Sequence, residues 1–431
     1  MQYYSTNRQV PPSTLRDAVF KGLADDGGLY MPERIPQLGS DFFTGLHKKT
    51  FREIAFEAAA ALFGEDIAAA PLRHIIDDAL NFDIPLVKVS SRIYSLELFH
   101  GPTMAFKDVG ARFLARMMQY LTRNENAETN VLVATSGDTG SAVANGFLGV
   151  EGITVTVLYP KGLVSKIQEA QFTTLGQNIR ALEVQGAFDD CQRLVKQAFL
   201  DKSLRAQRTL TSANSINLAR FIPQAFYYFW GWAQMPKDSE IVACVPSGNF
   251  GNLTAGLLAQ RMGLPLKHFI AANNVNDIFL KYLQTAKFSP RPSIPTIANA
   301  MDVGNPSNFA RIMDLYGNDH AKAAAAISGY SYSDAQIRET VQRVFAEAHY
   351  LLDPHGACAY EALHEYLQND KEAKGFFLET AHPAKFKETM DGIPGADVAI
   401  PGKLQAFMRG KKQTAIISNR YEDFKAFLLS S

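Results

Sequence analysis

The sequence predicts an α/β fold built on parallel β-sheets. From about residue 90 onward, short apolar or β-branched runs alternate with segments of helical spacing, and glycine-containing turns join them. Apolar strands separated by helices are typical of βαβ units, whose sheets are covered on both faces. Such sheets bind ligands in the crevice at the carboxyl ends of their strands, which is where the glycine turns of this chain fall.

Residues 1–90 do not follow this alternation, and we expect them to form a mostly helical segment. The stretches TFREIAFEAAAALFG and PLRHIIDDALNF carry apolar residues at helical spacing. A capped short helix and a Gly-Gly turn precede them. No motif in residues 1–90 suggests a catalytic role, and so we interpret the segment as a packing or oligomerisation layer.

The alternation of strands and helices can be followed in order along the rest of the chain. The predicted strands are the apolar runs of NVLVATSG, GITVTVLYP, IRALEVQG, EIVACVPSG and KHFIAANN, and the helices between them are in GDTGSAVANGFLG, SKIQEAQFTTLG, DDCQRLVKQAFLD and GNLTAGLLAQRMG. Residues 285–310 are rich in Pro, Ser and Asn and predict a long connection, which is often functional. Beyond 310 we expect helices up to a strand in GFFLETAHPAKF, and a peripheral helical tail at the end.

Charge and cysteine content narrow the classes of function. Lys plus Arg number 43 and so do Asp plus Glu, which argues against a nucleic-acid binder but not against a small anionic ligand. The three cysteines, Cys191, Cys244 and Cys358, form no CxxC pair and predict reduced core thiols. The N-terminus has no signal-peptide pattern and no apolar run is long enough for a membrane span, so the expected location is cytoplasmic.

Lys107 lies in LELFHGPTMAFKD, directly after an apolar run and at the predicted start of a helix. Val109, Phe113 and Met117 share one face of that helix, and Asp108 suits its first turn. A helix N-terminus and apolar neighbours both disfavour an ammonium group, and so we expect a lowered pKa for Lys107. A neutral amine can form a Schiff base. The alternative is a lysine that extends to solvent from a helix start.

Two glycine turns follow predicted strands. In TSGDTGSA, Ser136, Asp138 and Thr139 offer hydrogen bonds beside the glycines, although an ordinary capped turn has the same composition. In PSGNFGNLTAG, small residues with free amides at a strand-to-helix junction favour a phosphate cradle over a simple turn. The second turn is neither GxxxxGK[ST] nor GxGxxG, which excludes the common nucleotide-binding patterns.

A third polar run, TSANSINLARF, opens a helix and brings Asn214, Ser215 and Arg220 together. These side chains can clamp a second anion, or they can form a polar helix start with Arg220 exposed. No HExxH motif or Cys/His cluster indicates a metal, and no GxSxG indicates a serine hydrolase. A neutral lysine together with one phosphate cradle is what pyridoxal phosphate requires.

Taken in order, HGPTMAFKD, TSGDTG, SANSIN and PSGNFGN resemble the threonine synthase family, in particular its longer branch with an N-terminal extension. The resemblance runs from DGGLYMPE to TAHPAKFKE. It implies a tryptophan synthase β-like fold, with two αβα domains that each contain a parallel sheet. It also implies pyridoxal 5'-phosphate as cofactor and the conversion of O-phospho-L-homoserine and water to L-threonine and phosphate.

The resemblance assigns roles to residues of this chain. It implies that Lys107 forms the Schiff base and then acts as the general base. For the cofactor, the resemblance implies that its phosphate is bound by the amides of Gly248, Asn249, Phe250 and Gly251, with Asn252, that Thr380 contacts the pyridine nitrogen, and that Asp138 lies near the phenolic oxygen. For the substrate, it implies that Ser136 and Thr139 contact the carboxylate or phosphate. It also implies that the substrate phosphate is bound by Asn214, Ser215 and Arg220. Met104 and Gly356 stand where the family often has other residues.

The resemblance also implies a division into domains. We expect a large cofactor-binding domain of residues 91–124 and 236–400, a smaller mobile α/β domain of 125–235 and a C-terminal helical tail of 401–431. The expected partner is the small-molecule substrate, without nucleic acid or membrane, for a monomer or homodimer.

Two other functions fit the same motifs. One is another lyase of this fold, either a serine/threonine dehydratase or a phospholyase acting on a phosphorylated amine. A dehydratase needs no clamp for a substrate phosphate, so Arg220 with Asn214 and Ser215 distinguishes it. The other is a non-catalytic sensor of a phosphorylated metabolite, against which Lys107 argues because binding alone requires no Schiff base.

Overall fold

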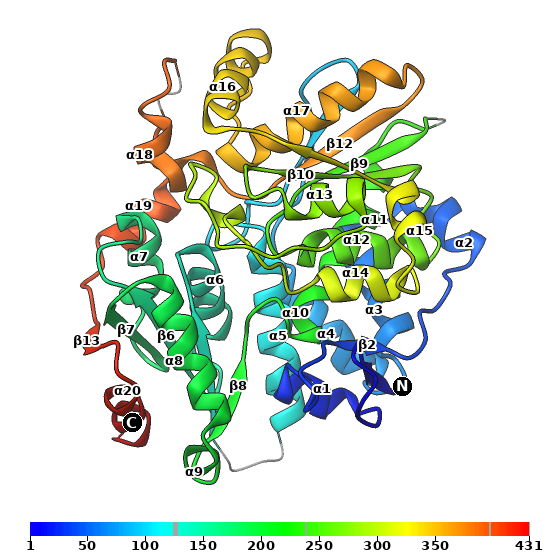
Figure 1. The fold of residues 1–431 in the computed structure, drawn as a ribbon. Helices are drawn as coiled ribbons and strands as arrows, with labels where there is room; N and C mark the ends of the chain where they lie inside the picture. The colour runs from blue at the N-terminus through cyan, green and yellow to red at the C-terminus, as the bar shows by residue number, and fades with distance from the viewer. Residues whose placement is uncertain (124–127, 238, 396–397, 431) are drawn as a thin grey trace.

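Three β-sheets organise the chain (Figure 1), and the computed structural model describes residues 1–123, 128–237, 239–395 and 398–430. The largest sheet has six strands in the order β11-β10-β9-β12-β4-β3. Its strands are β3 (Leu86–Lys88), β4 (Ile93–Glu97), β9 (Ile241–Pro246), β10 (His268–Asn273), β11 (Ile327–Ser331) and β12 (Lys374–Glu379). All neighbours are parallel except β3, which runs antiparallel to β4 at the edge.

A second sheet has five parallel strands in the order β13-β7-β6-β5-β8. Its strands are β5 (Thr129–Ala134), β6 (Ile153–Pro160), β7 (Ile179–Gln185), β8 (Thr209–Ser212) and β13 (Ala415–Ser418). A small antiparallel ribbon joins β1 (Tyr3–Ser5) to β2 (Tyr30–Pro32) near the N-terminus. The two large sheets confirm the predicted α/β class with parallel strands.

Helices cover both faces of the larger sheets. The N-terminal helices are α1 (Leu15–Lys21), α2 (Ser40–Gly45), α3 (Phe51–Phe63) and α4 (Ala69–Ala79), followed by α5 (Lys107–Thr122). Around the five-stranded sheet lie α6 (Asp138–Phe147), α7 (Lys166–Thr173), α8 (Phe188–Leu200), α9 (Lys202–Arg205), α19 (Gly402–Met408) and α20 (Tyr421–Ser430). The remaining helices are α10 (Leu218–Phe221), α11 (Gln224–Gln234), α12 (Gly251–Arg261), α13 (Ile278–Thr285), α14 (Phe309–Leu315), α15 (His320–Ala326), α16 (Asp334–Ala348), α17 (Pro354–Asn369) and α18 (Lys387–Met390).

Alternate residues of each central strand enter different hydrophobic cores, as the two-residue period of a strand requires. In β9, Ala243 and Val245 belong to the core shared with α11 and α12, whereas Val242 and Cys244 belong to the core beneath α17. All three cysteines are buried and free, as the sequence predicted. Among the described residues, none of the helices combines the length and apolar character that a membrane crossing requires.

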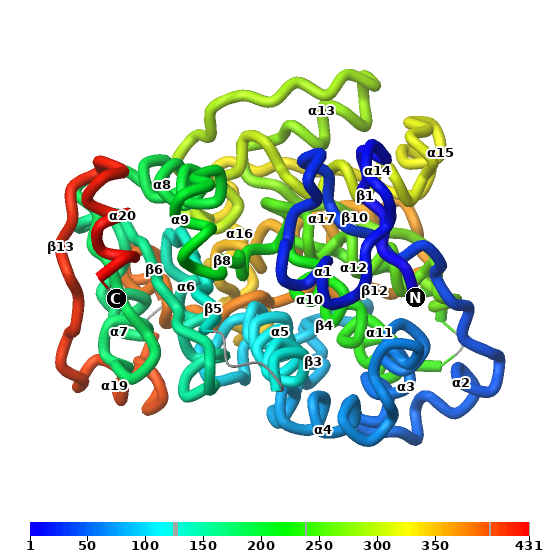
Figure 2. The backbone as a smooth tube through the Cα atoms, turned by 90° about the horizontal axis from the view of Figure 1, so that it is seen from below, coloured from blue at the N-terminus to red at the C-terminus, as the bar shows by residue number. Residues whose placement is uncertain are grey.

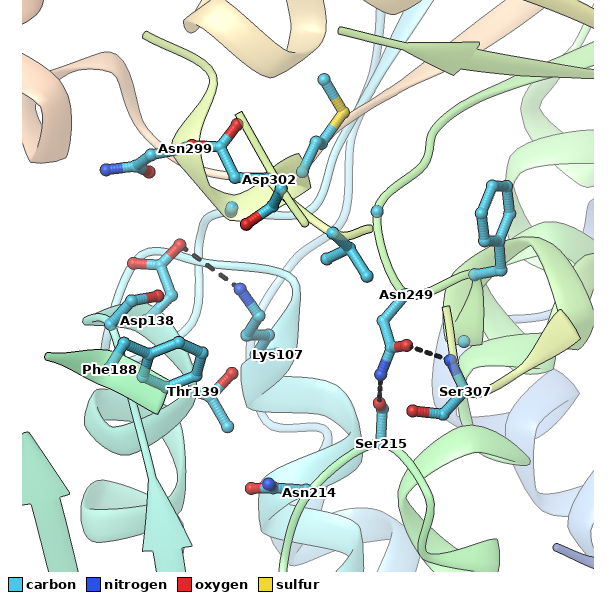
Figure 3. A pocket seen from close by; sticks show the side chains of 18 of the residues that line it. Lys107, Asp138, Thr139, Phe188, Asn214, Ser215, Asn249, Asn299, Asp302 and Ser307 are labelled. Carbon is cyan, nitrogen blue, oxygen red and sulfur yellow. Dashed lines mark hydrogen bonds and ion pairs between the residues drawn. The ribbon is translucent and has the colours of Figure 1, made fainter. Parts of the chain in front are cut away.

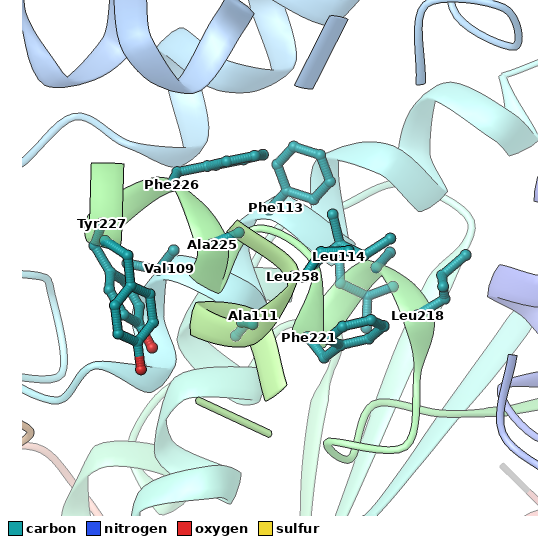
Figure 4. Close-up of a cluster of buried hydrophobic side chains, with 14 of the residues drawn as sticks. Val109, Ala111, Phe113, Leu114, Leu218, Phe221, Ala225, Phe226, Tyr227 and Leu258 are labelled. Atoms are coloured by element: carbon teal, nitrogen blue, oxygen red, sulfur yellow. The ribbon is translucent and has the colours of Figure 1, made fainter. Parts of the chain in front are cut away.

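Helix α5 packs its apolar face against α10, α11 and α12 (Figure 4). Val109, Phe113 and Met117, predicted to share this face, have no exposed surface. Phe113 lies edge-on to Phe226 with ring centroids 5.9 Å apart. Since removing a buried phenylalanine side chain costs about 3–5 kcal/mol, this packing anchors the helix that begins with Lys107.

The structure contains strands that were not predicted, among them β4 and β8. The ribbon β1–β2 and strand β11 occur where helices and loops were expected, and β3 joins the large sheet although it lies within 1–90. The expected helical tail of 401–431 contains β13, which extends the five-stranded sheet at the opposite end of the molecule from the N-terminal helices (Figure 2). Short strands with little apolar pattern form here because a neighbouring strand completes their hydrogen bonds. The boundary expected between 124 and 125 lies outside the described residues.

Candidate active site

One cavity of about 590 Å³ lies at the carboxyl ends of both large sheets (Figure 3). It collects all of the site residues proposed from the sequence: Lys107, Ser136, Asp138, Thr139, Asn214, Ser215, Arg220, Gly248, Asn249, Phe250, Gly251, Asn252 and Thr380. The volume falls within the usual range for small-molecule sites. Motifs that are far apart in the sequence therefore line one common cavity.

Lys107 is the first residue of α5, at the predicted helix start. The loop before it is held from both sides. Asp108 accepts hydrogen bonds from the backbone N–H of Thr103 at 2.9 Å and from its hydroxyl at 2.6 Å. The N–H of Phe106 donates to the carbonyl of Thr380 at 2.8 Å, so the lysine and the end of β12 are positioned together.

Two charged groups accompany Lys107 inside the protein. Its Nζ lies 3.7 Å from Oδ2 of Asp138, and its side chain keeps 16% of its surface exposed. Asp138 Oδ1 is also 2.7 Å from Nζ of Lys385, which has no exposed surface. Burial lowers the pKa of Lys107, with Lys385 and Arg220 acting in the same direction and Asp138 acting against them. Although burial opposes them, the two lysines hold the pKa of Asp138 well below its usual range.

The TSGDTG turn presents Asp138 at the start of α6. Gly137 has φ of 146°, and a Cβ there would come within 2.5 Å of Gln168 Oε1, so only glycine fits. Gln168 Nε2 donates to Asp138 Oδ1 at 2.8 Å. Ser136 is exposed and Thr139 half-buried on the same turn, which leaves both hydroxyls accessible from the cavity.

The PSGNFGN turn leads from β9 into α12. Phe250 adopts the left-handed conformation with φ of 61°, which is uncommon for a residue with a side chain and marks a turn held by its surroundings. Asn249 fixes it laterally: Nδ2 donates to Ser215 Oγ at 2.6 Å, and Oδ1 accepts from Ser307 N–H at 2.6 Å (Figure 3). The side chain of Asn252 donates to the carbonyl of Pro246 at 2.9 Å and so closes the turn itself.

Arg220 is buried, which decides against the exposed alternative. Its Nη1 donates to the carbonyl of Ala213 at 2.6 Å, whereas Nε has no partner among the described residues. Burial lowers the pKa of Arg220 to about 10, and the group stays charged at neutral pH. Asn214 Oδ1 is likewise buried without a hydrogen bond within the described residues. Unused polar atoms beside a cavity are typical of a ligand site.

Several residues of the site escaped the sequence analysis. Arg311 in α14 has no exposed surface and donates to the carbonyls of Ser215 and Ile216 at 3.2 and 2.7 Å. Lys385 reaches Asp138 from the 3₁₀ turn η3 (Pro383–Phe386). Both follow unremarkable local sequence. The one available signal was that Lys385 follows the predicted strand in GFFLETAHPAKF by a few residues.

The walls of the cavity also include parts that carry no motif. Phe188, Asp189 and Gln192 from α8 line one side. The long connection contributes residues between Ser293 and Ser307, including the turn η2 (Asn299–Met301). This bears out the expectation that 285–310 is a long connection and places much of it at the site.

Comparisons with known proteins agree with this geometry. The sequence model of the family described as "Pyridoxal-phosphate dependent enzyme" matches residues 83–376. Models described as "Threonine synthase N terminus" and "Threonine synthase, C-terminal" match residues 2–80 and 356–428. A threonine synthase from Haemophilus influenzae is 41% identical over 433 residues, covering 100% of both chains.

Two crystal structures extend the likeness to three dimensions. Threonine synthase from Escherichia coli superposes with a TM-score of 0.92 at 37% identity, covering 100% of both chains. The pyridoxal-phosphate-bound threonine synthase from Brucella melitensis gives a TM-score of 0.93 at 34% identity, covering 99% of this chain and 98% of that one. The chain therefore belongs to the threonine synthase family of pyridoxal-phosphate-dependent enzymes.

Proposed function

We propose that the protein converts O-phospho-L-homoserine and water to L-threonine and phosphate by γ-elimination and β-hydration, the last step of threonine biosynthesis. One observation carries the proposal: a single cavity contains an amine with a lowered pKa, Lys107, and a buried arginine without an acidic partner among the described residues, Arg220. The amine suits removal of a proton from carbon, and the arginine suits the phosphate of the substrate.

Pyridoxal 5'-phosphate is the cofactor of this family, and the residues of the cavity fit it. The turn from Gly248 to Asn252 opens α12, an eleven-residue helix whose N-terminal amides favour an anion. A Cβ on Gly248 would come within 2.8 Å of the Ala300 carbonyl oxygen, so this turn has no room for a side chain in place of the glycine. Lys107 and Thr380, joined through the Phe106 hydrogen bond, supply an amine and a hydroxyl nearby.

Each residue then has a part in binding. We assign the cofactor phosphate to the amides of Gly248, Asn249, Phe250 and Gly251, with Asn252 holding the turn, the pyridine nitrogen to Thr380 and the phenolic oxygen to Asp138. We assign the substrate carboxylate or phosphate to Ser136 and Thr139. The substrate phosphate is assigned to Asn214, Ser215 and Arg220. When bound, the cofactor supplies an electron sink for the carbanion at the substrate α-carbon.

Lys107 performs the proton transfers in this scheme. Neutral Nζ, on the first residue of α5, takes the proton from the α-carbon and would also take one from Cβ. Arg220 holds the phosphate until the Cγ–oxygen bond breaks, and its charge stabilises the leaving group. Cβ gives up a proton as phosphate leaves, Cγ is then protonated, water adds to Cβ, and a proton returns to the α-carbon. The buried walls limit other solvent at the site, which protects the reactive carbons from side reactions.

The smaller α/β domain, residues 125–235, closes over the substrate against the large domain of 91–124 and 236–400 in this proposal. The cavity lies between them: Asp138 and Phe188 come from one side, and Asn249 and Ser307 from the other. Substrate should therefore slow hydrogen exchange around Phe188, which lines the cavity from α8. The protein is expected to work in the cytoplasm as a monomer or homodimer, where its free buried cysteines stay reduced.

Arg220 also weighs against the alternatives. A serine/threonine dehydratase has no second phosphate to bind, and a buried guanidinium without an acidic partner among the described residues would be a cost without a use. A phospholyase retains the clamp and differs only in its product. A sensor has no need for a lysine with a lowered pKa beside the ligand.

The test is an assay of purified protein with pyridoxal 5'-phosphate and O-phospho-L-homoserine, in which threonine and phosphate are quantified together. Equal amounts of both support the proposal. Phosphate with a keto acid in place of threonine would make the protein a phospholyase or another lyase. The matched control is Lys107→Ala, which should fold normally and form no threonine; turnover like that of the wild type would refute the assigned role of Lys107.

A further inference from the structure

Lys385 is completely buried, yet it carries a charge into the protein interior. Its Nζ lies 2.7 Å from Oδ1 of Asp138 and donates to the carbonyl of Thr103 at 2.8 Å. It does not line the cavity, whereas Asp138 and Lys107 do. Burying an ammonium group is costly unless the group is paired and hydrogen-bonded, so the contacts of Lys385 indicate its role. Those contacts are the Asp138 turn and the loop that precedes Lys107.

Asp138 contacts a lysine through each of its two carboxylate oxygens. Asp138 Oδ1 is close to Lys385, and Oδ2 is 3.7 Å from Nζ of Lys107. The shorter contact, reinforced by Gln168 on the same oxygen, ties the carboxylate to Lys385. Lys385 and Asp138 together are neutral. Lys107 can then lose its proton without leaving an uncompensated negative charge beside it.

The same contacts join different parts of the fold. Asp138 begins α6, beside the five-stranded sheet, whereas Lys385 follows β12 of the six-stranded sheet. Thr103 belongs to the loop that carries Lys107, and its carbonyl also accepts from Gln171 Nε2 of α7 at 2.9 Å. The Lys385 ammonium group thus connects the start of α6 with the loop that precedes Lys107.

We propose that Lys385 is a positioning residue for the reaction: by pairing with Asp138 it prevents that carboxylate from holding Lys107 in its protonated form. The proposal rests on the role of Lys107 stated above. It adds that the basicity of Lys107 is set by a residue that touches neither substrate nor cofactor. Without Lys385, Lys107 would be the only cation left beside Asp138 among the described residues, and the attraction would favour the charged amine.

The groups that face Lys107 define what a pH measurement would report. They are Asp138 from α6, Lys385 from η3 and Arg220 from α10. Asp108, next along α5, faces Lys385 and Arg220, and it is buried and hydrogen-bonded to Thr103. Asp189, Asp302 and His355 also line the cavity. The Lys385→Met substitution removes one positive charge from this set and leaves Lys107 as the group that the Asp138 carboxylate attracts.

The first measurement is made on the full chain freed of cofactor. A trace amine-reactive reagent labels neutral amines, and mass spectrometry of the Lys107 peptide gives the pH at which half of the amine reacts. In Lys385→Met this midpoint should rise by about one pH unit or more, the effect of one nearby opposite charge. In Lys385→Met/Asp138→Asn it should return toward the wild-type value. An unchanged or lowered midpoint in Lys385→Met would overturn the proposal.

The second measurement uses the holoenzyme and its pH profile. Lys385→Met should move the rising limb of kcat to higher pH, because Lys107 is a free amine only in the enzyme–substrate complex, and should lower the rate at neutral pH about tenfold. Lys385→Arg, which keeps the charge, should restore part of the rate. Lys387→Met is the matched control, because Lys387 pairs with Asp391 at 2.7 Å and does not line the cavity. A uniform loss at all pH values, equal in the single and double variants, would indicate a structural role only.

Folding is checked by circular dichroism. If Lys385→Met does not fold, Asp138→Asn provides the test: losing the carboxylate while Lys385 keeps its charge should lower the Lys107 midpoint, and a rise would overturn the proposal. The labelling result does not depend on the substrate. A wrong substrate assignment would therefore abolish threonine formation in the wild type while leaving the labelling difference intact.

Discussion

Gly356 lies against the carboxyl group of Glu379, so closely that a Cβ on Gly356 would overlap Glu379 Oε2. Gly356 is in the first turn of α17 and Glu379 is the last residue of β12, directly before Thr380. Both are buried, and their chain neighbours His355 and Thr380 line the cavity. The Glu379 carboxyl group therefore occupies the space that a side chain at position 356 would need.

Gly356→Ala should destabilise the protein, because the added methyl group overlaps a buried carboxyl group that is fixed by the Asp353 N–H at 2.6 Å. Overpacking of this kind costs about 1–3 kcal/mol. Adding Glu379→Ala should recover most of the loss by removing the overlapping atoms. Urea unfolding measures both variants, and Gly402→Ala is the control, because a methyl group added at Gly402 would meet no atom within 4 Å. A double variant no more stable than Gly356→Ala would contradict the pairing.

Glu379 should make stability depend on pH. Burial, and then the neighbouring Asp353, raise the pKa of Glu379 well above its ordinary value. The folded protein therefore keeps a proton that the unfolded chain loses above about pH 4.3. Because the native state binds more protons in this range, stability falls as pH rises from there toward the raised pKa. Glu379→Gln should flatten this dependence in urea midpoints measured from about pH 5 to 8, whereas Glu347→Gln, at an exposed position, should leave it unchanged.

Arg311 should be needed for both stability and substrate binding. It donates to the carbonyl of Tyr30 at 3.0 Å and to those of Ser215 and Ile216, so its loss takes this donor from one buried and two partly buried carbonyl groups. Arg311→Met should lower the free energy of unfolding by about 3 kcal/mol and raise KM, since the Ser215 loop is released. The comparison is Arg8→Met, whose side chain is 64% exposed and pairs with Asp314, with an expected change below about 1 kcal/mol. Equal effects in the two variants would show that the buried contacts of Arg311 contribute little.

Arg220→Ala tests the separation of the two anion sites. Its removal should raise KM for O-phospho-L-homoserine about 30- to 100-fold, the effect of losing a charge-assisted hydrogen bond, while cofactor affinity changes little. Steady-state kinetics and cofactor titration measure the two quantities separately. Arg34→Ala, at a side chain 67% exposed, is the control. Loss of the cofactor before any rise in KM would mean that the two phosphate sites are assigned the wrong way round.

Local patterns in the sequence were sufficient for the central strands β5, β6, β7, β9, β10 and β12 and for the motif residues at their ends. Lys107 could be placed at a helix start because Val109, Phe113 and Met117 define the face that must be buried. The site residues meet in one cavity because the carboxyl ends of parallel strands share an edge. Both inferences use spacing along the chain, which sequence records directly.

Only the tertiary structure decided which distant groups complete one another. Strand β13 has two exposed residues among its four and becomes a strand because β7 offers a free edge. Lys385 is charged in the interior because Asp138 meets it there, and Gly356 is required because Glu379 fills its space. Pairing of this kind depends on contact and charge compensation between segments far apart in the sequence. The sequence by itself therefore determined the fold class and singled out Lys107, whereas the charged groups that surround Lys107 became apparent only in the folded chain.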